Sequence, residues 1–147
     1  MKQRESGFSM IKVLFWLVIL AALSSVGFQL LSIHQTGWKV QDIFDNVSRK
    51  MADSSEENIR EKLPQLFKVN YIYRKDLPEE FYTNILILRD GGRVEISSSY
   101  MDTLWPLGQV ENVDEEGTYD PKELTGMDYF RDLTRYDIYF EPYAKTP

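Results

Sequence analysis

One uncharged apolar run near the start of the chain, residues 13–33, constrains its structure more than any other feature. The run holds 21 residues without a charge, and at about 1.5 Å per helical residue it would extend roughly 31 Å, the thickness of a bilayer's hydrocarbon core. A cleaved secretory signal is the alternative, with small residues at 21–25, but apolar residues continue to Ile33 and favour a retained anchor. We therefore predict a transmembrane helix over 13–34.

The residues before this run carry the signal for its orientation. Lys2, Arg4 and Lys12 lie in the basic N-terminus, residues 1–12. Positive residues flanking a span stay in the cytoplasm, so the remainder of the chain is expected on the opposite side. In a bacterial inner membrane this places the C-terminal domain in the periplasm. The expected partners of the chain are the lipid bilayer, through the span, and other integral membrane subunits.

The rest of the chain is acidic. Residues 1–34 carry a net charge of +2, so the whole-chain charge of −6 leaves −8 on residues 35–147. Nucleic-acid binding requires clustered Lys and Arg and is not expected of such a domain. The absence of cysteine excludes disulfides, thiolate metal sites and cysteine nucleophiles.

Small, polar and aromatic residues of the span suggest contacts with membrane neighbours. The candidates are Trp16, Ser24, Ser25, Gly27, Gln29 and Trp38. The two tryptophans fit the inner and outer interfaces. Gln29 would either bond a partner helix or meet water near the outer interface, with the second favoured. His34, the single histidine, fits an interfacial residue better than a ligand or a base.

Two amphipathic helices are expected after the span. The first covers 35–53, and either continues from the span or is separated from it by a bend near Gly37; its apolar stripe comprises Val40, Ile43, Phe44, Val47 and Met51. The second begins with a capping box of Ser54 and Glu57 and carries Ile59, Leu63, Leu66 and Phe67 on one face. Pro64 is expected to kink or end it.

The apolar period then changes from helical to alternating. A short alternation covers 69–73, and an apolar strand at 85–88 ends at Gly91 and Gly92, which predict a hairpin. The return strand places Val94, Ile96, Ser98 and Tyr100 on one face, and a last strand covers 136–140. The expected fold of residues 54–147 is a small α+β domain, with one or two helices packed on a short antiparallel sheet.

A long irregular loop over 106–134 interrupts this domain. Loops of this length are often functional. Its apolar residues are candidate partner contacts, or alternatively they tuck the loop onto the sheet: Trp105, Leu107, Met127, Tyr129 and Phe130.

The same loop contains a partial calcium-binding pattern. The ligand positions of an EF-hand would fall on Asn112, Asp114, Glu116, Asp120 and Glu123, with Gly117 at the sharp turn. Pro121 inside the loop and the lack of a preceding amphipathic helix favour a solvated acidic loop instead. Elsewhere Ser97, Ser98 and Ser99 have no histidine to activate them, so neither an enzyme, a cofactor nor a small-molecule substrate is expected.

Two resemblances add expectations. Gly7-Phe8-Ser9-Met10-Ile11 resembles the processing site of type IV pilins and pseudopilins, although Lys12 stands where that family has a Glu that aids assembly. The segments 4–9, 57–63, 87–92 and 136–140 resemble a proteobacterial single-span envelope family known as domain of unknown function 4845. The first implies a minor filament component cleaved after Gly7. The second, which brings no known activity, fits an accessory or scaffolding subunit of a membrane complex.

Overall fold

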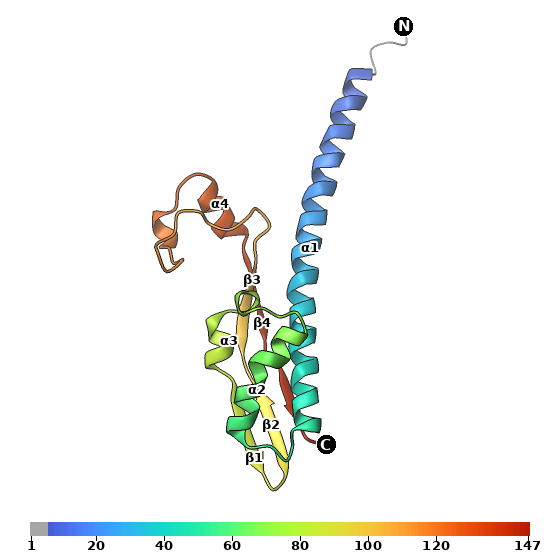
Figure 1. Cartoon of the computed structure of the whole chain (residues 1–147). Helices are drawn as coiled ribbons and strands as arrows, with labels where there is room; N and C mark the ends of the chain where they lie inside the picture. Colours follow the sequence, from blue (N-terminus) through green and yellow to red (C-terminus); the bar gives the residue numbers. More distant parts are fainter. Residues whose placement is uncertain (1–5) are drawn as a thin grey trace. The chain divides into compact units, whose positions relative to one another are not determined.

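The computed structural model describes residues 6–147 and divides into two compact units (Figure 1). One unit combines Leu104–Tyr136 with the part of the chain up to Leu31. The other combines Ser32–Thr103 with Asp137–Pro147. The basic residues Lys2 and Arg4, on which the predicted orientation depends, lie outside the described residues.

Helix α1, Ser6–Lys50, contributes to both units (Figure 1). It is long and apolar enough to cross a membrane, and none of its most apolar window is buried within the chain. Of the two alternatives for the helix over 35–53, the structure has continuation from the span, because α1 runs through Gly37 and ends at Lys50. Glycine costs a helix only about 1 kcal/mol relative to alanine, and here the packing beyond it compensates.

Helix α2, Glu56–Val69, corrects the predicted N-cap and excludes one of the two alternatives for Pro64, that it ends the helix. Ser55, and not Ser54, caps it by accepting the Asn58 N–H at 3.2 Å, because Ser54 belongs to the preceding turn and donates its N–H to Met51. Pro64 lies inside the helix without ending it. The lost hydrogen bond is tolerated because the neighbouring turns are held in the core by their buried residues, Ile59, Leu63 and Phe67.

The alternating apolar residues at 69–73 do not form a strand. Val69 is the last residue of α2, and Tyr71 adopts a positive φ of 60° with its side chain exposed. The buried residue is Ile72, whose N–H bonds the Phe67 carbonyl at 2.9 Å and closes the helix end. Two short helices follow, η1 (Arg74–Asp76) and α3 (Glu79–Thr83).

The predicted hairpin is confirmed. β1 (Leu86–Asp90) pairs antiparallel with β2 (Arg93–Ser97) around Gly91 and Gly92, whose φ values of 52° and 82° suit the turn. β2 also pairs antiparallel with β5 (Tyr143–Lys145), which gives the order β1-β2-β5. The expected return strand, residues 94–100, is split between two sheets. Its first part belongs to β2, whereas Tyr100 begins β3 (Tyr100–Leu104), which pairs with β4 (Tyr136–Phe140) in a separate two-stranded sheet.

The hydrophobic core belongs to the second unit. One face of the hairpin meets the helices, as predicted for Val94, Ile96, Ser98 and Tyr100, which are all buried. Helix α1 contributes a fully buried stripe, Val40, Ile43, Phe44 and Val47. Phe81 of α3 stacks on the Phe44 ring and meets the Tyr100 ring edge-on. The α+β fold class is therefore the one expected.

Candidate interaction surface

The segment between β3 and β4, residues 105–135, is not an irregular loop. It contains a short helix η2 (Pro121–Glu123) and a two-turn helix α4 (Met127–Thr134). We call residues 105–135 the β3–β4 segment. Its own buried apolar residues are few, Val110 and Leu124, so polar contacts must supply most of its order.

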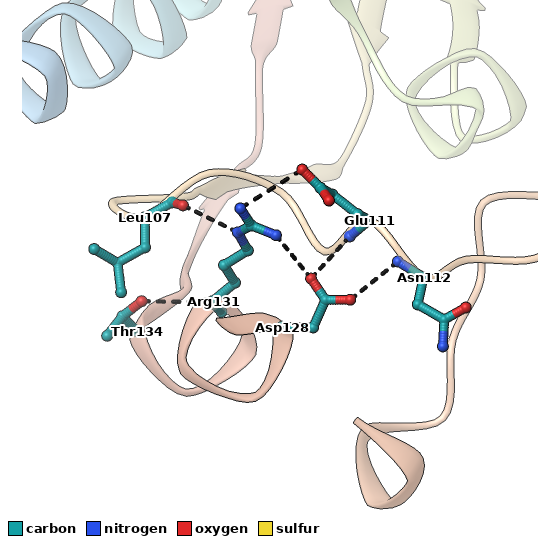
Figure 2. A network of polar contacts seen from close by, with 6 residues as sticks. All are labelled: Leu107, Glu111, Asn112, Asp128, Arg131 and Thr134. Atoms are coloured by element: carbon teal, nitrogen blue, oxygen red, sulfur yellow. Dashed lines mark hydrogen bonds and ion pairs between the residues drawn. The ribbon is translucent and has the colours of Figure 1, made fainter. Parts of the chain in front are cut away.

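A carboxylate organises this polar network (Figure 2). Asp128 of α4 accepts the backbone N–H groups of Glu111 and Asn112, both at 3.1 Å, and bonds Arg131 at 2.9 Å. These contacts join the backbone at Glu111 and Asn112, in the first part of the segment, to α4. They also favour the ionised form, so the Glu111 N–H, followed by Arg131, holds the pKa of Asp128 below its usual value.

Arg131 completes the same network from the next turn of the helix (Figure 2). Its guanidinium donates to the Leu107 carbonyl at 3.2 Å and lies 3.6 Å from the Glu111 carboxylate. The side chains of Arg131 and Asp128 are only 20% and 14% exposed. The charged face of α4 is thus turned toward its own segment.

The opposite face of α4 is apolar and exposed. Met127, Tyr129, Phe130 and Leu133 lie within one arc of the helix, and each is at least half exposed, at 57%, 50%, 53% and 65%. We call these four residues the α4 apolar face. Leu107 is also exposed. Of the five predicted contact residues, four are therefore exposed and are not tucked onto the sheet, whereas Trp105 is partly buried. Leu133 was not among the predicted contact residues. Its spacing of four residues from Tyr129 and three from Phe130 is that of one helix face and could have indicated it.

The β3–β4 segment contacts α1 through a pair that sequence could not have joined. The Trp105 backbone N–H donates to Gln29 Oε1 at 3.2 Å, across 76 residues of sequence. Both residues are partly buried and belong to the same compact unit. Neither expectation for Gln29, a partner helix or water, described this intramolecular role.

The other predicted membrane residues remain on the surface of α1. Trp16 is 60% exposed, and the Ser24 hydroxyl donates to the Leu20 carbonyl of its own helix. Ser25 is exposed, and nothing lies near the position where Gly27 would carry a Cβ. In the second unit the Trp38 ring stacks on His34.

The candidate calcium ligands are directed to other tasks. Asp114 accepts the N–H groups of Glu116 and Thr118 and the Thr118 hydroxyl, which together lower its pKa. Asp120 caps η2 by accepting the Lys122 N–H at 2.9 Å. Asn112 and Glu123 line one open pocket together with these two aspartates, whereas Glu116 does not line it. Among the described residues, however, no three His, Cys, Asp or Glu side chains converge on a metal position.

A second candidate site is a cavity of about 260 Å³ beside α2. Leu63, Phe67 and Ile85 contribute apolar walls, and Arg60 and Arg74 stand at its margin. Both arginines are engaged, Arg60 with Glu56 at 3.0 Å and Arg74 with Glu79 at 2.8 Å. No sequence pattern indicates this cavity, because its walls come from elements that are brought together only by tertiary packing.

No family model, curated protein or solved structure matches this chain. The class of protein is therefore described from the structure alone. It is a protein with one long apolar helix, suited to crossing a membrane, followed by a small α+β domain.

Proposed function

We propose that this chain is a non-enzymatic single-pass membrane protein that acts as an accessory or scaffolding subunit of a larger membrane complex. One observation carries the proposal: no residue in the most apolar window of α1 is buried by the rest of the chain. Its cover must come from lipid, from helices of other subunits, or from both. Small residues such as Ser25 and Gly27 leave room for a neighbouring helix.

The second unit offers a surface for a subunit outside the span. Leu86 and Leu88 alternate with buried Ile87 and therefore share the sheet face that points away from the core. They are 50% and 51% exposed, and Tyr143, which pairs with Ser97 as Leu86 does, is 47% exposed. β1 is also an edge strand of this sheet. An exposed apolar sheet face of this kind is typical of a docking site.

Native mass spectrometry of the full-length chain, extracted from its own membranes in mild detergent, tests the proposal. We expect a fixed set of partner subunits. The double variant L86S/L88S should lose a partner, whereas V69S/Y71S, which changes two exposed residues elsewhere in the same unit, should retain it. A chain that carries only detergent and lipid would contradict an accessory role.

A pilin-like filament component is the second candidate. The observation that favours it is the continuity of α1, in which one helix carries an exposed apolar first part and a buried stripe from Val40 to Val47. Copies could cover one another's apolar parts. The same mass measurement separates the two, because a chain beginning at Phe8 and bound mainly to itself would support the filament and overturn the accessory subunit.

A further inference from the structure

We propose that the α4 apolar face lies in lipid at the membrane interface near the C-terminal end of the apolar run. There it forms a second membrane contact beside the span of α1. This goes beyond the proposed function, which concerns protein subunits. Lipid acyl chains and headgroups cover the face. The evidence is the polarity of α4, the position of the β3–β4 segment along α1 and the arrangement of the charges of α4.

The polarity of α4 is reversed relative to that of a helix that packs in water. Its charged residues Asp128 and Arg131 are 14% and 20% exposed at their side chains, whereas Phe130 and Leu133 are 53% and 65% exposed. A surface helix of a water-soluble domain turns its apolar stripe inward. Exposure of four apolar side chains to water costs free energy, and this cost disappears if a nonaqueous phase covers them.

The position of the segment identifies that phase. Trp105 begins the β3–β4 segment and bonds Gln29. Gln29 precedes Ile33, the end of the apolar run, by four residues, or roughly 6 Å along a helix. Helices that lie in a membrane interface bury their apolar face about 5–10 Å deep, which is the same range. The segment therefore starts at the depth where an interfacial helix lies.

The charges of α4 are arranged for such a site. Asp128 and Arg131 neutralise one another on the face turned into the segment. Asp132 pairs with Arg135 at 3.2 Å and accepts the Tyr119 hydroxyl at 2.7 Å. No charged side chain lies within the arc of the α4 apolar face, and Tyr129 in that arc is a residue type enriched at membrane interfaces.

Because the chain contains no cysteine, single spin labels can report the environment of this face in the full-length protein. The protein is reconstituted in vesicles of phosphatidylethanolamine and phosphatidylglycerol. Labels at F130C and L133C test the face, L20C in the span is the lipid reference, and E115C, exposed in the same segment, is the aqueous reference. We expect the ratio of oxygen to nickel-chelate accessibility at F130C and L133C to exceed that at E115C severalfold and to approach that at L20C.

Two results would overturn the proposal. A ratio equal to that at E115C would mean that the face is in water, and immobilised labels shielded from both reagents would mean that a protein surface, such as a second copy, covers it.

A second measurement avoids changing α4. The variant W16F/W38F leaves Trp105 as the sole tryptophan, and acyl chains brominated near the headgroup should quench its fluorescence by at least half. Unquenched emission would contradict the inferred depth.

Discussion

Helices α2 and α4 are both amphipathic, yet they use their two faces in opposite ways. In α2 the apolar residues Ile59, Leu63 and Phe67 are buried, and the ion pair of Arg60 with Glu56 lies outside, with side chains 45% and 51% exposed. In α4 the ion pair is turned inward and the apolar residues are outside.

The difference indicates two sources of order. Helix α2 is stabilised by apolar area removed from water, which scales at about 25 cal/mol per Å². Helix α4 is positioned by charge-assisted hydrogen bonds from neighbouring backbone to Asp128, which are stronger than bonds between neutral groups. Hydrophobic pattern alone therefore predicts that a helix forms, and its surroundings decide which face is covered.

The largest expected effect comes from truncating one phenylalanine in each helix. F67A removes a ring that is 5% exposed and packs edge-on against Phe81, so it should cost about 3–5 kcal/mol of unfolding free energy. F130A, at a ring 53% exposed, should change that free energy by less than about 0.5 kcal/mol. Denaturant unfolding in mild detergent, followed by circular dichroism, measures both. Equal losses would break the contrast between the helices.

A second pair of variants extends the contrast to α1. A Cβ at Gly37 would lie 3.1 Å from the Phe140 ring, whereas nothing lies within 4 Å of one at Gly27. G37L should therefore destabilise the second unit by about 1–3 kcal/mol through overpacking. G27L should be tolerated and gain up to about 1 kcal/mol of helix propensity. Thermal unfolding of the two variants in the same detergent compares them, and a lower midpoint for G27L than for G37L would contradict the expectation.

The smallest expected effect is a difference in pH response between the units. The pKa of Asp128 is lowered, so its stabilisation is complete above the unfolded Asp value of about 3.9 and is lost as the pH falls through the lower folded pKa. Burial raises the pKa of Asp102 in β3, so acidification removes a cost there and has the opposite sign.

Hydrogen exchange, expressed as protection relative to the unstructured chain, resolves this difference. Protection of the Glu111 and Asn112 amides should fall as the pH drops below about 4, whereas amides of α2 such as Phe67 should keep theirs. In D128N the Glu111 response should disappear, while the Thr118 amide, bonded to Asp114, still responds. Acid loss of protection at Phe67 before Glu111 would refute the assignment.

Much of the fold could be predicted from local pattern. The apolar run, the stripe from Val40 to Val47 and the Gly91-Gly92 hairpin each depend on neighbours in sequence, and the structure has all three. Errors arose where a local cue had a tertiary competitor. Pro64 did not end α2 because buried residues on either side hold it, and the alternation at 69–73 was a helix end followed by a turn at Tyr71.

The candidate surface was predicted only in part. Met127, Tyr129 and Phe130 were selected as contact residues, but the helix that presents them was not, because Gly126 and the preceding Pro121 read as loop. The bond from Trp105 to Gln29 joins residues 76 positions apart, and no sequence pattern encodes it. The reversed polarity of α4 likewise depends on where the backbone of Glu111 lies.

The closing strand β5 has a consequence for synthesis of the protein. Thr146 bonds the Ser48 carbonyl at 2.6 Å across 98 residues, and its N–H bonds Val94. Contacts of such long sequence separation form late. While the ribosome is still translating, the stripe of α1 around Phe44 has no sheet to cover it, even though the apolar run ahead of it has already emerged. The nascent chain must therefore keep this stripe from aggregating until residues 143–146 have been synthesised and can pair with β2 and bond α1.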